Sequence, residues 1–238
     1  CMNICMLVYE VIDKVNEGPN DPHIFKAIFL AGGPGSGKGF VVKNLMGADS
    51  TGLRIVNSDD VYEKLASLAK PEPLDLKDPE VVASPQGQEA REKAKRITKA
   101  RQGNYLDGRL GLIIDGTAKD VEKTKRQKDE LESLGYDTMM VFVNTNMEVA
   151  QDRNKQRDRQ LPDEMVIQMW HAVQDNLMKF QQLFGNQNFY LVDNSGGLED
   201  PDRKENFEAV EKAIRRFISS PPRKPQAKSW LADQRPTK

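Results

Sequence analysis

A glycine-rich segment with one lysine is the clearest chemical signal in the sequence. Residues 32–39 read Gly-Gly-Pro-Gly-Ser-Gly-Lys-Gly, which has the glycine, four-residue gap and Gly-Lys spacing of a loop that binds phosphate. Glycines let backbone N–H groups and the N-terminus of the following helix face phosphate oxygens, while the lysine reaches the β- and γ-phosphates. The segment therefore predicts a nucleoside triphosphate site, with ATP as the expected ligand. Its predicted binding residues are Gly33, Pro34, Gly35, Ser36, Gly37, Lys38 and Gly39.

The residues after the lysine depart from the usual motif. A Ser or Thr hydroxyl normally follows the lysine and holds Mg²⁺, whereas Gly39 and Phe40 stand here. Magnesium is therefore expected to be held through Ser36, other side chains, water or the nucleotide itself.

Two adjacent carboxylates, Asp59 and Asp60, follow the second short apolar run. If that run is a strand, both lie at the carboxyl edge of the sheet, where ligands bind in open α/β folds. A hydroxyl that receives a phosphoryl group needs a carboxylate to orient it and accept its proton. Asp59 is the predicted catalytic base, and Asp60 is expected to cap a helix or contact magnesium. The alternative, that these residues only cap the helix, stays open.

A third acidic position, Asp115, ends the run Leu-Ile-Ile-Asp and is followed by Gly116 and Thr117. It falls at the same predicted edge of the sheet. Asp115 and Thr117 are candidates for binding the acceptor, and Asp115 also for binding magnesium through water. A simple Asp-Gly turn is the alternative.

Three arginines, Arg153, Arg157 and Arg159, lie within seven residues and precede Leu161-Pro162. The planar guanidinium of arginine grips phosphate oxygens and offsets charge that develops in a transition state. We therefore expect a closing lid near residues 153–162, with Arg153 and Arg157 as catalytic residues. A solvated basic helix end is the alternative.

Five short apolar runs must position these residues, and stretches of helical composition separate nearly all of them. This alternation is typical of an α/β fold with a parallel, doubly wound sheet. The expected strands are 26–31, 53–57, 110–115, 138–144 and 189–193.

The expected helices are amphipathic or end at helix-stop signals. Four prolines between residues 70 and 85 predict a loop or flap there without a regular helix. The expected helices are 37–46, 60–69, 86–102, 120–134, 147–154, 162–184 and 201–218.

Length and composition fit one domain with appendages. The chain has 238 residues, and its 35 Lys and Arg nearly balance its 36 Asp and Glu, so total charge indicates neither nucleic acid nor membrane as a partner. The apolar runs are far shorter than the roughly 20 residues that span a bilayer. Two cysteines exclude a disulfide framework and fit the cytoplasm. The expected organisation is an N-terminal extension (1–22), a main domain (23–218) and a flexible, basic, Pro-rich tail (219–238).

Four motifs together resemble the kinase domain of phage polynucleotide 5′-hydroxyl kinases over about residues 25–195. The wider group of P-loop kinases that includes zeta toxins and adenylate kinases is similar in the same places. The motifs are Gly-x-Pro-Gly-Ser-Gly-Lys, Asn57-x-Asp59-Asp60, Asp115-x-Thr117, and Arg153-Asn154-x-x-Arg157 with Leu161-Pro162.

This resemblance implies a P-loop NTPase fold of nucleoside-kinase-like architecture, a five-stranded parallel sheet flanked by helices, that uses ATP and Mg²⁺. It implies that Asp59 is the general base, that Lys38 binds phosphate and that Arg157 contacts the transferring phosphoryl group. An acceptor-binding arginine of that family falls where this chain has Tyr62, which makes Tyr62 a candidate for acceptor binding.

The expected acceptor is a hydroxyl on nucleic acid, either a 5′ end or a hydroxymethylated base of DNA. A basic ridge formed by Arg91, Lys95 and Lys99 could follow a nucleic-acid backbone, although a solvated helix face is the alternative. Other open readings are a zeta-toxin-like nucleotide-sugar kinase, a nucleoside monophosphate kinase, and a non-catalytic nucleotide-binding switch. If the protein is phage-encoded, its expected location is the host cytoplasm.

Overall fold

The computed structural model describes residues 21, 23–44, 52–157, 160–196 and 199–234. Arg159 and nearly all of the expected N-terminal extension lie outside the described residues.

The core is a five-stranded sheet in the order β2-β3-β1-β4-β5, in which every neighbouring pair is parallel. All six residues of the central strand β1 are buried, as expected when helices cover both faces of a parallel sheet. The five predicted strands and the predicted fold class are confirmed. The strands are β1 (Lys26–Ala31), β2 (Arg54–Val56), β3 (Leu112–Asp115), β4 (Asp137–Asn144) and β5 (Phe189–Asp193).

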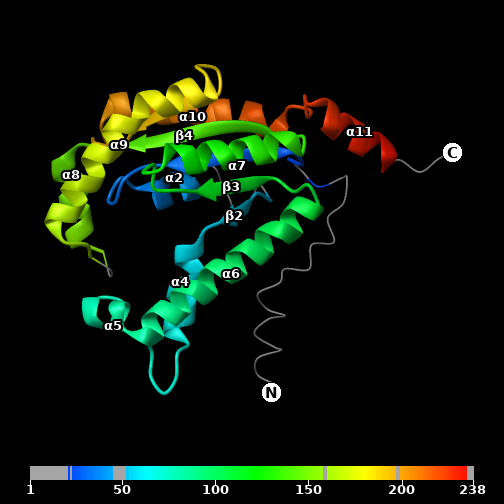
Figure 1. Cartoon of the computed structure of the whole chain (residues 1–238). Coiled ribbons are helices and arrows are strands. Elements are labelled where there is room, and N and C mark those ends of the chain that lie inside the picture. The colour runs from blue at the N-terminus through cyan, green and yellow to red at the C-terminus, as the bar shows by residue number, and fades with distance from the viewer. Residues whose placement is uncertain (1–20, 22, 45–51, 158–159, 197–198, 235–238) are drawn as a thin grey trace.

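Helices cover both faces of this sheet (Figure 1). One hydrophobic cluster joins α7, α9 and α11 to alternate strand residues such as Phe29 and Phe142. A second cluster joins α2 and α10 to the intervening strand residues, which face the other side of the sheet, such as Ile28 and Val141. No helix among the described residues is long and apolar enough to cross a membrane. The helices on the sheet are α2 (Lys38–Asn44), α7 (Val121–Ser133), α8 (Met147–Lys155), α9 (Asp163–Phe184), α10 (Pro201–Ser219) and α11 (Pro225–Asp233).

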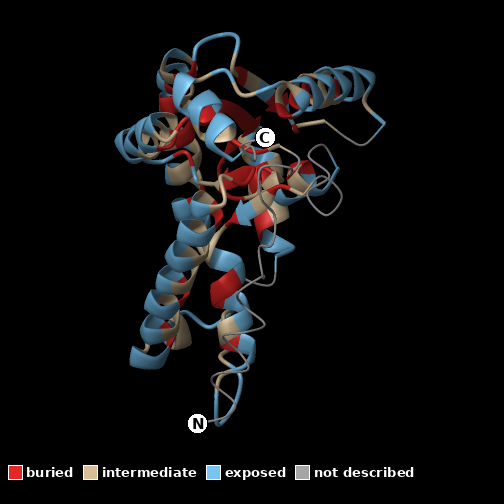
Figure 2. Ribbon diagram, turned by 90° about the vertical axis from the view of Figure 1, so that its right-hand side faces the viewer, coloured by how far each residue is buried: buried red, intermediate tan, exposed pale blue. Residues whose placement is uncertain are grey.

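Three further helices form an arm that projects from the sheet: α4 (Ser58–Ser67), α5 (Pro79–Ala83) and α6 (Pro85–Asp107). Figures 1 and 2 show α4 and α6 side by side along this arm. A small cluster of Val61, Tyr62 and Ala94 joins them. Asn57 after β2 and Asp115 at the end of β3 line a pocket together with Gly39 of the phosphate loop.

The predicted loop between residues 70 and 85 contains a short helix, α5, which corrects that expectation. Asp78 caps α5 and Pro79 is its first residue. Ser84 caps α6, which also begins with proline, Pro85. Proline is compatible with the first turn of a helix, because the N–H that it lacks has no intrahelical partner there. Two of the four prolines therefore start helices instead of preventing them.

The predicted flexible tail is also corrected, because its described residues form α11 and pack on the domain. Ala227 is fully buried, and the Trp230 ring packs edge-on against Phe25 at 5.5 Å. The segment before α11 is held at the buried Lys26–Asp137 ion pair, where the Lys26 Nζ donates to the Ser220 Oγ at 3.0 Å. These contacts outweigh a composition that is rich in proline and charge.

Candidate active site

The phosphate loop connects β1 to α2 and has a backbone that requires glycine. Gly35 and Gly37 have φ angles of +72° and +86°, which side chains rarely adopt. A Cβ atom at Gly35 would also collide with the backbone of Ala150, and one at Gly37 with the side chain of Asn194. The loop therefore lies directly against α8 and the segment after β5, with the N-terminus of α2 facing its concave side.

Ser36 and Lys38 provide polar groups inside this loop. The Ser36 Oγ is buried and has no hydrogen-bond partner among the described residues. The Lys38 Nζ donates to the carbonyl oxygens of Gly32 and Gly33 at 2.8 and 3.3 Å. A buried hydroxyl without a partner is costly, and binding to a phosphate oxygen or magnesium would satisfy it. Ser36 therefore fits the predicted metal role.

The charges around Lys38 come from three different elements. Burial lowers the pKa of Lys38; Asp115 opposes this effect, Arg157 adds to it, and Asp59 opposes it. The fold thus brings four of the predicted site residues, Lys38, Asp59, Asp115 and Arg157, into one electrostatic cluster at the carboxyl edge of the sheet.

The start of α4 separates helix capping from the predicted base. Asn57 is the N-cap residue, and its Oδ1 accepts a hydrogen bond from the Asp59 N–H at 2.8 Å. Neither Asp59 nor Asp60 is the cap, so the capping alternative does not account for them. The Asp59 carboxylate is 55% exposed, and its Oδ1 lies 3.9 Å from the Arg91 Nη2. The role of Asp59 as the general base stays a prediction.

The same Asn57 side chain links two further carboxylates. Its Nδ2 donates to the Asp60 Oδ1 and to the Asp115 Oδ2, each at 3.0 Å. Burial raises the pKa of Asp115 to about 6; Lys38 opposes the rise, and Asp60 and Asp59 add to it. Burial, reinforced by neighbouring carboxylates, also raises the pKa of Asp60. Asn57 therefore holds together acids that repel one another when ionised.

This arrangement fits a magnesium ion that is coordinated by both the protein and the nucleotide. The Asp115 Oδ1 is buried without a hydrogen-bond partner among the described residues. The described residues contain no cluster of three or more His, Cys, Asp or Glu that could hold a metal alone. Magnesium commonly takes one or two carboxylates and completes its shell with phosphate and water. Asp115 and Ser36 fit that pattern, with Asp60 beside them.

The predicted lid begins on α8. The Arg153 Nη1 donates to the Gly35 carbonyl at 3.4 Å, so this arginine lies on the phosphate loop. Burial, together with Arg203, lowers the pKa of Arg153. Arg157 follows the end of α8 and is exposed. Asn154 pairs with the backbone of Leu161, its Nδ2 donating at 2.8 Å and its Oδ1 accepting at 3.1 Å, which brings the two ends of this segment together.

The two remaining predicted residues lie in contrasting places. Thr117 is exposed in the loop after β3. Tyr62 is 1% exposed, and the guanidinium of Arg91 lies over its ring at 5.3 Å. The Tyr62 ring therefore has no free face on which an acceptor could stack.

Two further residues, which the sequence patterns did not indicate, form hydrogen bonds at the phosphate loop. The Asn194 Nδ2 donates to the Ser36 carbonyl at 2.7 Å, and Arg203 donates twice to the Asn194 Oδ1. The position of Asn194 directly after β5, at the ligand-binding edge of the sheet, is a signal that could have identified it. Arg203 stands among many charged residues of α10 and carries no such signal.

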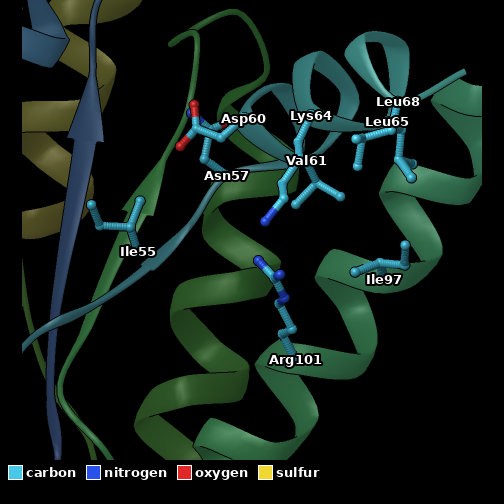
Figure 3. Close-up of a pocket in the computed structure, with 9 residues that line it drawn as sticks. All are labelled: Ile55, Asn57, Asp60, Val61, Lys64, Leu65, Leu68, Ile97 and Arg101. Carbon is cyan, nitrogen blue, oxygen red and sulfur yellow. The ribbon is translucent and has the colours of Figure 1, made fainter. Parts of the chain in front are cut away.

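Two adjoining pockets lie between the sheet edge and the arm, and they share Ile55, Asn57 and Asp60. The one of about 250 Å³ extends to α2 and Asp115. The one of about 210 Å³ extends between α4 and α6. Figure 3 shows the ends of Lys64 and Arg101 pointing into the same space there. Its other lining residues are Val61, Leu65, Leu68 and Ile97.

Solved structures of the same fold come from several sources. The PezAT chromosomal toxin–antitoxin system of Streptococcus pneumoniae has a chain that is 15% identical, with coverage of 89% of this chain and 94% of that one and a TM-score of 0.61. A putative kinase from Chloroflexus aurantiacus is 14% identical, with coverages of 83% and 99% and a TM-score of 0.55. The AvrRxo1-ORF1:-ORF2 complex with ATP is 14% identical, with coverages of 94% and 82% and a TM-score of 0.54. At these identities the likeness shows the fold.

Sequence comparison identifies the family. No curated protein sequence matches the chain. The model of the Zeta toxin family matches residues 11–205, which include the phosphate loop, both acidic motifs, Arg153 and Arg157. This match spans well over half of the chain, and the chain therefore belongs to the Zeta toxin family.

Proposed function

We propose that this protein is an ATP-dependent phosphotransferase that moves the γ-phosphate of ATP onto a hydroxyl group. The observation that carries the proposal is that Asp115, Arg157 and Asp59 all act electrostatically on Lys38 of the phosphate loop, in which the Ser36 Oγ has no hydrogen-bond partner among the described residues. A general base for an acceptor hydroxyl and an exposed arginine near the phosphates suit phosphoryl transfer better than nucleotide binding alone. Membership of the Zeta toxin family and the structure of the AvrRxo1 complex with ATP also support this function.

The residues divide the transfer between them. The loop N–H groups and Lys38 hold the β- and γ-phosphates. Asp59 accepts the proton of the acceptor hydroxyl as its oxygen bonds to the γ-phosphorus, while the bond to the bridging oxygen breaks and ADP leaves. Lys38 and Arg157 offset the charge that develops. Magnesium, where bound by Ser36 and Asp115, would neutralise phosphate charge.

A small anionic acceptor, such as a nucleotide sugar, fits the pockets better than a nucleic-acid strand. The two adjoining pockets are open to solvent and have volumes of about 210 and 250 Å³; Lys64 and Arg101 line the smaller one and Asp115 the larger one. These cations suit an acceptor's phosphate groups, and the apolar lining suits a ring.

The predicted basic ridge on α6 gives less support to nucleic acid. Arg91 packs on Tyr62 and faces Asp59 within the arm. The Lys95 Nζ lies 2.6 Å from the Glu92 Oε1. Among the described residues, Lys99 is the one cation of the ridge without an ionic or aromatic partner. The ridge therefore offers fewer unpaired cations to a nucleic-acid backbone than the sequence predicted.

A transfer assay tests both the proposed phosphotransferase activity and the proposed class of acceptor. The protein is incubated with Mg²⁺, ATP labelled at the γ-phosphate, and a panel of nucleotides, nucleotide sugars, and DNA and RNA with 5′-hydroxyl ends. We expect label on a nucleotide sugar or related small anion, and none with Lys38→Ala. If only a polynucleotide is labelled, the proposal of a small anionic acceptor is wrong. Binding of ATP without transfer to any acceptor would favour the switch alternative.

A further inference from the structure

The carbonyl of Ser36 determines where an important N–H of the phosphate loop points. It accepts a hydrogen bond from the Asn194 Nδ2 at 2.7 Å. In a planar trans peptide the C=O and the following N–H point in opposite directions. Because Asn194 draws the Ser36 carbonyl to the outside of the loop, the Gly37 N–H is turned toward its phosphate-binding side.

Arg203 fixes the orientation of the Asn194 amide. Its Nε and Nη2 donate to the Asn194 Oδ1 at 3.1 and 3.0 Å, and Asn194 and Arg203 are 2% and 8% exposed. Guanidinium groups only donate hydrogen bonds, so the amide oxygen must face Arg203 and the amide nitrogen must face Ser36. Without Arg203, the Asn194 amide would lose both hydrogen bonds to its oxygen and keep only its bond to the Ser36 carbonyl to orient it.

Phe40, the residue that departs from the usual motif, packs on the same group. The Arg203 guanidinium lies 5.2 Å from the centre of the Phe40 ring and 4.5 Å from that of Phe207, and the two ring centres are 5.9 Å apart. Cation–π contacts of this kind hold a guanidinium in place. Phe40 thus connects the first turn of α2 to α10, one residue after the position where a magnesium-binding hydroxyl is usual.

We propose that Asn194, Arg203 and Phe40 form a brace that orients the Ser36–Gly37 peptide and thereby sets the affinity for the β- and γ-phosphates. These are positioning residues, and their role rests on the proposed function, because it requires a triphosphate in the loop. Within the brace, Phe40 anchors α2, the helix that begins at Lys38.

Binding of ATP and of inorganic tripolyphosphate, measured by calorimetry with thermal melting alongside, tests the brace. Asn194→Ala and Arg203→Met should each weaken both ligands about tenfold, as expected for one strong hydrogen bond. The double variant should lose no more than either single one, since the two residues act as a unit. Arg203→Lys should be intermediate. Arg215→Met, a matched control on α10 whose arginine is exposed and paired with Glu211, should bind normally.

The outcomes distinguish a specific effect of the brace on phosphate affinity from a general loss of stability and from a failure of the proposed function. Additive losses in the double variant, or unchanged tripolyphosphate binding in a folded Arg203→Met protein, would overturn the proposal. If Arg203→Met does not fold, Phe40→Leu serves instead, because that side chain is partly exposed, and unchanged affinity in it would overturn the brace. If Lys38→Ala also binds ATP normally, the proposed function itself fails.

Discussion

At the scale of single residues, the site is organised by one amide among three acids. Asn57 caps α4 through the Asp59 N–H and donates to Asp60 and Asp115. Capping is thereby assigned to a neutral residue, and the Asp59 carboxylate stays 55% exposed, 3.9 Å from the Arg91 Nη2. This division of roles makes the two adjacent aspartates experimentally separable.

Asp59→Asn should keep ATP affinity and slow phosphoryl transfer by about 10²-fold or more, because the acceptor hydroxyl loses its base. Single-turnover transfer and ATP calorimetry measure the two effects. Asp60→Asn is the matched control and should be milder, with partial recovery at high magnesium if that carboxylate contacts the metal. Near-normal transfer by Asp59→Asn together with a dead Asp60→Asn would reverse the assignment.

Asp115 should make stability depend on pH. Its pKa is raised to about 6 in the folded protein, so the folded state binds the proton more tightly than the unfolded state. Stability is therefore lost as pH rises from about 4 to above 6 and regained as it falls. Asp115→Asn should be more stable than the parent by about 1 to 2 kcal/mol at pH 7.5, and the gap should close near pH 4. Denaturant unfolding at both pH values measures this, and a gap that is constant with pH would contradict it.

The proposed catalytic residues can be identified as candidates in the sequence because their types and spacings are local. Lys38 follows its glycines, and Asp59 follows a strand. Asn194 was marked only by its position directly after β5, and Arg203 could not be predicted in the same way, because its role depends on how close α10 comes to the phosphate loop. That proximity is a property of the packed molecule.

At the scale of elements, strands were predicted well because apolar runs bounded by turn residues are a strong local signal. α11 was missed because its burial depends on a few side chains. Ala227 packs where Gly135 has no Cβ, and Trp230 meets Phe25. Tertiary contacts of this kind override a local preference for disorder.

Trp230→Ala should lower the free energy of unfolding by about 2 to 3 kcal/mol, because it removes the aromatic contact that docks α11. Denaturant unfolding measures the loss. Lys228→Ala, an exposed change on the same helix, is the control and should change stability by less than about 0.5 kcal/mol. Equal effects of the two variants would show that α11 contributes little to the fold.

At the scale of the whole molecule, the strand order explains why the site forms where it does. β1 lies between β3 and β4, and β2 lies beyond β3, so the phosphate loop, Asp115 and the start of α4 meet at one edge. A parallel sheet was predictable from the alternation of elements. The order of its strands and the projection of the arm were not, because both depend on contacts between distant segments.

The proposed acceptor site is separable from the ATP site by mutation. Lys64 on α4 and Arg101 on α6 line the pocket between these helices, whereas Gly39 of the phosphate loop lines the adjoining pocket together with Asp115. Lys64→Ala and Arg101→Ala should each raise the KM for an anionic acceptor about tenfold, the cost of one charge-assisted contact, with unchanged ATP affinity. Steady-state transfer over a range of acceptor concentrations measures this. Lys99→Ala, which removes an exposed cation from α6 outside the pocket, is the control. An equal rise in KM for all three variants would indicate a diffuse attraction along α6, as for a polynucleotide, and would move the acceptor out of the pocket.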